Sequence, residues 1–191
     1  VGPTGKLLKP LGDLDFDKAV EIFSETIKIG AKYGVDLITI ETMNDSYETK
    51  AAVLAAKESC DLPILVTNAY GENGRLMTGA DPAVMVAMLE GMGVDAIGAN
   101  CSLGPKQLAG VMDELLKYSS VPVVFKPNAG LPKSENGVTF YDVDADDFAK
   151  DIKKSVENGV RIVGGCCGTT PEYIKKVHEL TCDLKPKTIE K

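Results

Sequence analysis

The chain has 191 residues, of which 44% are hydrophobic and 26% are charged, and this is enough for one substantial globular domain with its own core. A formal net charge of −7 argues against nucleic acid and against an anionic membrane as partners, because both are themselves negatively charged. The apolar runs all fall short of the roughly 18 residues that suggest a membrane span.

Five short apolar runs alternate with longer segments that have helical periodicity. The runs are continuously apolar, rather than alternating apolar and polar residues, which is typical of buried strands in a parallel sheet. We therefore predict strands at residues 36–42 (DLITIET), 63–69 (PILVTNA), 95–101 (DAIGANC), 121–128 (VPVVFKPN) and 160–166 (VRIVGGC).

The segments between these runs contain helix-start signals and helical faces. Asp81-Pro82 and Thr170-Pro171 each place a capping side chain before a proline that suits the first helical position. Asp45 and Glu48 resemble a capping box, with Asp in place of Ser or Thr. Two helices are expected to pack on the sheet through apolar residues on one side: Val20, Phe23 and Ile27 in the first, which Gly34 would end, and Phe148, Ile152 and Val156 in a later one.

The strand ends recur about every thirty residues, the length of one βα unit, which is compatible with an open doubly wound sheet or with a (βα)8 barrel. Neither GxGxxG after a strand nor GxxxxGK[ST] occurs, so the nucleotide-binding versions lose support. Polar residues at the carboxyl ends of the runs favour the barrel, where these ends surround one mouth. They are Glu41, Asn68, Asn100, Cys101, Asn128, Cys166 and Cys167.

A complete barrel usually takes about 250 residues and eight strands, whereas five full strands are found here. The first residues, VGPTGK, resemble the tail of an earlier strand and its loop. We expect an α/β fold: a (βα)8 TIM barrel, present as an incomplete barrel of five full parallel strands plus the end of an earlier one, over residues 1–181. The missing strands would belong to another chain or have been removed, and residues 182–191 would be a polar tail or the start of a linker.

Cys101, Cys166 and Cys167 lie at the ends of two predicted strands. Zinc favours thiolates, and a catalytic zinc site has three protein ligands and one open position. The GGCCG context allows the bend that two neighbouring cysteines need to face one metal, because on a regular strand they would point to opposite faces. The alternative is that all three are buried as small hydrophobic residues. Cys60 and Cys182 lie away from the mouth.

Three thiolates make zinc a poor generator of hydroxide, but they suit the binding and deprotonation of a substrate thiol. Alkyl transfer to sulfur is therefore the expected reaction class. The scattered spacing of the five cysteines is not a disulfide framework and favours a reducing, cytoplasmic setting. The first ten residues also lack the pattern of a signal peptide.

Several further residues have two interpretations. Glu41 is a substrate ligand or a helix cap, Asn100 orients the cysteine loop or forms a turn, and Asn128 lines the mouth or forms a turn. Lys126, within an apolar strand, is expected to form an internal ion pair with a carboxylate. His178, the only histidine, is expected to be an exposed or half-buried helix residue.

The motifs GANCS (98–102) and GGCCGT (164–169), together with VGPTG, ETM and KPNAGLP (126–132), resemble the zinc-dependent homocysteine S-methyltransferase family, and in particular the homocysteine-binding domain of cobalamin-dependent methionine synthases. The resemblance runs from Val1 to about Leu180. It implies a (βα)8 barrel in which Cys101, Cys166 and Cys167 hold Zn²⁺. It also implies that the carboxylate of Glu41 binds the amino group of homocysteine, with Asn100 and Asn128 as further candidate substrate-binding residues.

The resemblance implies transfer of a methyl group to the zinc-activated thiolate of homocysteine, which gives methionine. Methylcobalamin on another module would be the donor, and the partners would be cobalamin and folate modules and the remaining N-terminal barrel strands. One alternative is a stand-alone enzyme that uses S-methylmethionine or a related donor. Others are an inactive, metal-free scaffold and a phosphate-binding barrel that uses the Thr170-Pro171 helix start, in which Cys101 would have no role.

Overall fold

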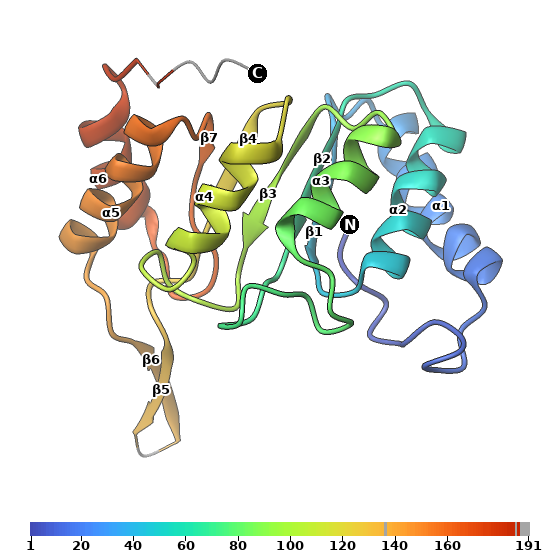
Figure 1. Cartoon of the computed structure of the whole chain (residues 1–191), viewed down its shortest axis with the longest axis horizontal. Helices are drawn as coiled ribbons and strands as arrows, with labels where there is room; N and C mark the ends of the chain where they lie inside the picture. Colours follow the sequence, from blue (N-terminus) through green and yellow to red (C-terminus); the bar gives the residue numbers. More distant parts are fainter. Residues whose placement is uncertain (136, 186, 188–191) are drawn as a thin grey trace.

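The computed structural model describes residues 1–135, 137–185 and 187. It confirms the predicted α/β fold: a parallel sheet with helices between its strands, arranged as part of a TIM barrel (Figure 1). The sheet has the strand order β1-β2-β3-β4-β7. Its strands are β1 (Ile38–Met43), β2 (Ile64–Asn68), β3 (Ala96–Asn100), β4 (Val123–Lys126) and β7 (Ile162–Val163).

Helices precede and follow these strands in the predicted order: α1 (Phe16–Lys32), α2 (Ser46–Ser59), α3 (Pro82–Gly91), α4 (Ala109–Tyr118), α5 (Ala145–Asn158) and α6 (Pro171–Thr181). Asp45 caps α2 by accepting from the backbone N–H groups of Tyr47 and Glu48, and Asp81 caps α3 through Val84. Among the residues that the structure describes, no helix is both long and apolar enough to cross a bilayer.

Two of the predicted caps differ from the structure. Thr170 occupies the N-cap position of α6, but its side chain makes no capping hydrogen bond to any described residue, so the capping prediction is wrong there. Glu48 is buried and accepts from the backbone N–H and the hydroxyl of Thr4 at 2.8 and 2.6 Å, instead of closing a capping box. This contact holds the N-terminal segment against α2.

The two faces of the sheet have different environments. On the outer face, the register places Ile40, Val66, Ile97 and Val123 side by side, and all four belong to the buried core that also contains the inward residues of α2, α3 and α4. Phe148, Ile152 and Val156 of α5 also lie in this core, as predicted. Hydrophobic burial between helices and this face therefore positions the strands.

On the inner face, the register places Thr67, Gly98, Val124 and Ile162 side by side. Ile162 is 39% exposed, so the prediction of fully buried strands is wrong for β7, which forms one edge of the sheet. At the other edge, the amino group of Val1 donates to the carbonyl of Thr39, and the N–H of Glu41 donates to the carbonyl of Val1. These bonds on either side of Ile40 are the pattern of a parallel neighbour, as predicted for the end of an earlier strand.

A short antiparallel hairpin was not predicted. It consists of β5 (Pro132–Glu135) and β6 (Val138–Tyr141), and Pro132 pairs with Tyr141 at its base. It is inserted between β4 and α5 and projects away from the rest of the molecule (Figure 1). The residues of β5 are all exposed, so hydrophobic periodicity does not mark them.

We expect Gly98→Ala to destabilise the fold strongly. A Cβ at Gly98 would lie 2.0 Å from the carbonyl oxygen of Val124, and only a shift of β3 against β4 would relieve the clash. The free energy of unfolding from urea titration should fall by about 3 kcal/mol. The control is Gly91→Ala, where a Cβ has no described atom within 4 Å, and this change should be neutral or stabilising by up to about 1 kcal/mol. Equal effects of the two changes would contradict the packing described.

Candidate metal centre

Three thiols meet at the carboxyl ends of the strands. The Sγ atoms of Cys101, Cys166 and Cys167 all lie within 4.8 Å of one another, and those of Cys101 and Cys167 are 3.7 Å apart. All three are free cysteines. The structure thus brings together residues that are far apart in the sequence, as expected from the barrel arrangement.

Cys101 follows β3 in a backbone conformation that few residues adopt. Its φ is +61°, and that of Ser102 is +58°, both in the left-handed region that is costly for residues other than glycine. The N–H of Cys101 donates to the carbonyl of Lys126 at 3.1 Å, and the Ser102 hydroxyl donates to the carbonyl of Tyr70 at 2.6 Å. Contacts with neighbouring strands therefore stabilise the turn that presents this thiol.

Cys166 and Cys167 lie beyond the end of β7, so the alternation of strand side chains does not apply to them. The segment is attached to residues 127–129 by three hydrogen bonds. Cys166 N–H donates to the Pro127 carbonyl at 2.9 Å, Cys167 N–H donates to Oδ1 of Asn128 at 3.0 Å, and Ala129 N–H donates to the Cys167 carbonyl at 2.9 Å. The predicted bend is thus present, and backbone contacts with the β4 loop hold it.

Asn100 is buried and links three strands to the thiols. Its Oδ1 accepts from Thr42 N–H at 2.8 Å and from the Thr67 hydroxyl at 2.7 Å. Its Nδ2 donates to Thr42 Oγ1 at 2.8 Å and lies 3.8 Å from Cys166 Sγ. Of the two interpretations of Asn100, these bonds support orientation of the cysteine loop over a simple turn. Direct contacts of Asn100 and Asn128 with substrate stay predictions.

Glu41 and Lys126 form an ion pair on the inner face, with 2.5 Å between Glu41 Oε2 and Lys126 Nζ. The predicted pairing of Lys126 with a carboxylate is therefore confirmed, but the pair is not internal, and its partner is the residue predicted to bind substrate. The alternative of a helix cap for Glu41 is wrong, because Asp45 caps α2. The side chains are 46% and 21% exposed respectively, so solvent reaches both.

Tyr141 is a site residue that sequence reasoning missed. It comes from β6, and its ring lies against Gly168, where a Cβ would be 2.3 Å from a ring carbon. Gly168 also has a φ of +80°, so both its conformation and this close approach require glycine. The pKa of Tyr141 is raised, mainly by partial desolvation of its hydroxyl and secondly by the nearby Cys167 thiol. The available signal was the run VTFY after the KPNAG motif, because its β-branched and aromatic residues favour a strand.

The surroundings of Cys166 disfavour its ionised form. Burial, followed by the neighbouring Cys101 and Cys167, raises the pKa of Cys166 to about 12. Without a cation, the thiolate form of Cys166 is therefore disfavoured, whereas a divalent metal would stabilise it. Within the described part of the chain, the cluster contains three sulfur donors and no His, Asp or Glu. Such a soft set fits zinc with an open fourth position.

Comparison with known proteins identifies the family. The sequence model of the family "Homocysteine S-methyltransferase" matches residues 1–181. The chain belongs to the homocysteine S-methyltransferase family. Cys101 is one of the three clustered thiols, whereas the phosphate-binding alternative gives this residue no role.

Among curated relatives of the chain, methionine synthase of Mycobacterium leprae is 32% identical over 93% of the chain, and that of Mycobacterium tuberculosis is 30% identical over 97%. The chain spans only 15% and 16% of their lengths. The homocysteine methyltransferase MmuM of Escherichia coli has the same fold. Its apo structure has a TM-score of 0.68 at 23% identity, with 95% of this chain and 60% of MmuM covered. A metallated form has a TM-score of 0.67.

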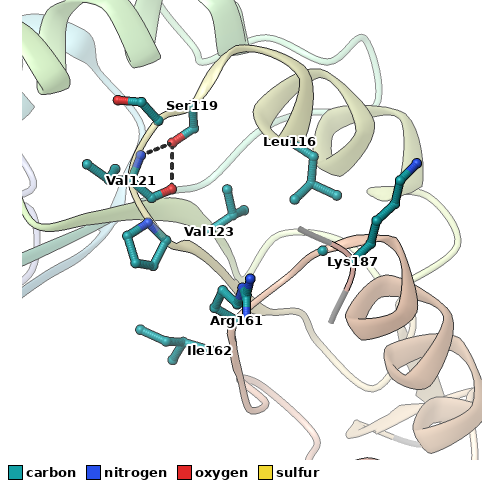
Figure 2. A pocket seen from close by; sticks show the side chains of 10 residues that line it. Leu116, Ser119, Val121, Val123, Arg161, Ile162 and Lys187 are labelled. Carbon is teal, nitrogen blue, oxygen red and sulfur yellow. Dashed lines mark hydrogen bonds between the residues drawn. The ribbon is translucent and has the colours of Figure 1, made fainter. Parts of the chain in front are cut away.

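The remaining candidates lie outside the cluster. His178 is exposed on α6, as predicted, and Cys60 and Cys182 lie at the ends of α2 and α6. Figure 2 shows a separate pocket of about 580 Å³ whose lining includes Val123 and Ile162. These residues begin β4 and β7, at the end of the strands opposite the thiols. Because active sites of barrels lie at the carboxyl ends of their strands, the cysteine cluster and not this pocket is the candidate site.

We expect each of Cys101→Ser, Cys166→Ser and Cys167→Ser to lose most bound zinc, because each removes one of three thiolates. Zinc per chain after dialysis, measured by atomic absorption, should fall from about one to below about 0.2. Cys60→Ser and Cys182→Ser are matched controls and should retain the metal. Loss of zinc from the controls, or retention in all three cluster variants, would show that the ion binds elsewhere.

The raised pKa of Cys166 predicts a pH dependence for the metal-free protein. Its folded-state pKa of about 12 exceeds the ordinary 9.0, so the unfolded state loses this proton first as the pH rises. The free energy of unfolding should therefore fall progressively above pH 9. Urea unfolding at pH about 8 and about 10 checks this. Cys166→Ser should show a smaller fall between the two pH values than the unmodified chain, and an equal fall would refute the assignment.

Proposed function

We propose that this chain binds Zn²⁺ through Cys101, Cys166 and Cys167 and methylates the sulfur of homocysteine to give methionine. The observation that carries the proposal is the meeting of three sulfur atoms within 4.8 Å, in a chain that belongs to this family. When bound, zinc would lower the pKa of the homocysteine thiol and keep its sulfur as a nucleophilic thiolate at neutral pH.

The residues of the chain would position the substrate and hold the ligands. Asn100 fixes Cys166 relative to β1 and β2, and Asn128 fixes the backbone of Cys167. Glu41 would bind the ammonium group of homocysteine. In the reaction, an electron pair of the homocysteine sulfur forms the S–CH3 bond, while the bond between the methyl group and its donor breaks and that electron pair leaves with the donor.

We propose methylcobalamin on another module as the donor, with a folate module to remethylate it. The support is the 30–32% identity to methionine synthases that are much longer than this chain. The edges of the sheet at β1 and β7 would pair with the remaining barrel strands, since a TIM barrel is closed. Five free cysteines suit the reducing cytoplasm.

The test is whether the zinc-loaded chain converts L-homocysteine to methionine, with mass spectrometry to measure the product. We expect methionine to form when methylcobalamin is the donor. Either removal of zinc or the Cys167→Ser substitution should lower the rate at least about 100-fold, because the homocysteine thiol then stays protonated. Product with S-methylmethionine but not with methylcobalamin would support the stand-alone enzyme instead. An unchanged rate in Cys167→Ser would exclude a metal-activated thiolate.

Glu41→Gln keeps the size of the side chain and removes its charge. We expect it to raise the KM for homocysteine about 10- to 100-fold, with a smaller effect on kcat, because a charge-assisted hydrogen bond to the ammonium group is lost. Glu58→Gln, a carboxylate on the exposed side of α2, is the control and should leave both constants unchanged. Equal KM values for Glu41→Gln and the unmodified chain would remove Glu41 from the substrate site.

A further inference from the structure

The Glu41–Lys126 ion pair joins two strands that are not neighbours. β1 and β4 are separated in the sheet by β2 and β3. In a flat sheet their backbones would be on the order of 14 Å apart, so the 2.5 Å contact is made by two long side chains that reach toward one another across the inner face. The pair therefore crosses the concave side of the partial barrel, where a barrel enzyme holds its substrate.

The register places both residues on that inner face. Lys126 pairs with Asn100, two residues beyond the inner-face partners Gly98 and Val124. Glu41 is two residues beyond Thr39, whose partner Leu65 is two residues before the inner-face Thr67. Because strand side chains alternate, Glu41, Thr67, Asn100 and Lys126 share one face.

The pair also borders both parts of the thiol cluster. The carbonyl of Lys126 accepts from Cys101 N–H, and its side chain passes Gly164, where a Cβ would lie 3.4 Å from Lys126 Cγ. Glu41 directly precedes Thr42, whose N–H donates to Asn100, and Asn100 in turn contacts Cys166. A carboxylate and an ammonium group thus lie next to the residues that hold the thiol cluster, on the same face of the sheet.

We infer that Lys126 binds the α-carboxylate of homocysteine while Glu41 binds its ammonium group, so that the substrate inserts into the Glu41–Lys126 ion pair. The inference rests on the proposed function and adds a specificity residue to it. An α-amino acid carries both charges on one carbon, so it replaces one ion pair by two and leaves the site neutral. The half-exposed Glu41 makes this exchange feasible, since solvent screens the existing pair.

The inference predicts which thiols bind. Removal of the carboxylate from the ligand should have the same effect as removal of the charge from Lys126, because both abolish the same contact. The probes are L-homocysteine and 3-aminopropane-1-thiol, which lacks only the carboxylate. The variant is Lys126→Met, which keeps the length of the side chain without its charge. Lys150→Met, at the exposed ion pair with Asp147, is the matched control.

Dissociation constants for both thiols would be measured by calorimetry on the zinc-loaded proteins, with zinc content checked for each. The unmodified chain and Lys150→Met should bind L-homocysteine about 10- to 100-fold more tightly than 3-aminopropane-1-thiol. Lys126→Met should lose this preference and bind the two thiols within about threefold of one another. Lys126→Arg, which keeps a cation, should retain part of it.

The outcomes separate the two hypotheses. If the unmodified zinc-loaded chain binds neither thiol, the proposed function itself fails. Suppose that the unmodified chain binds homocysteine, but that Lys126→Met keeps the full preference for homocysteine over 3-aminopropane-1-thiol or loses affinity for both thiols by the same factor. The role of Lys126 is then overturned and the proposed function stands. If Lys126→Met does not fold, equal affinity of the unmodified chain for the two thiols would still overturn the inference, and a preference that Lys126→Arg retains would support it.

Discussion

The geometry of the site depends on the hydrogen bonds of the Asn100 side chain. It is buried at the end of β3, and its four contacts reach β1, β2 and the segment after β7. A buried amide with all its polar atoms paired is strongly oriented, because any rotation leaves donors or acceptors unsatisfied. The position of Cys166 is thereby coupled to two strands that precede it by more than ninety residues in the sequence.

Most of the fold followed from the apolar runs and the helix-start residues, since burial under helices and N-terminal capping are local signals in the sequence. The convergence of the cysteines followed from one further step, because the carboxyl ends of parallel strands meet at a barrel mouth. The hairpin was missed because its first strand is exposed throughout. With it, Tyr141 was missed, since its approach to Gly168 depends on where an exposed hairpin folds.

The partner of Lys126 could not be derived from the sequence for a different reason. An ion pair with a carboxylate was expected, but Glu41 lies 85 positions away and three strands across the sheet. The order of the strands in the folded sheet and the reach of two long side chains bring them together, and the sequence of a single strand reveals neither its neighbours in the sheet nor the twist between them. The left-handed conformations of Thr42 and Cys101 were equally hidden, because tertiary contacts and not their own residue types stabilise them.

The strand β7, which precedes two of the three thiols, contributes little to the stability of the cluster. β7 has only two residues, is at an edge of the sheet, and leaves Ile162 exposed. The cysteines after it are held by backbone and side-chain bonds to residues 127–129, which belong to the loop after the well-buried β4. Since these bonds are local to the mouth, the thiol arrangement does not require closure of the barrel. The proposed substrate contacts differ in this respect, because the Glu41–Lys126 pair joins β1 to β4 and so depends on the relative placement of strands that are not neighbours.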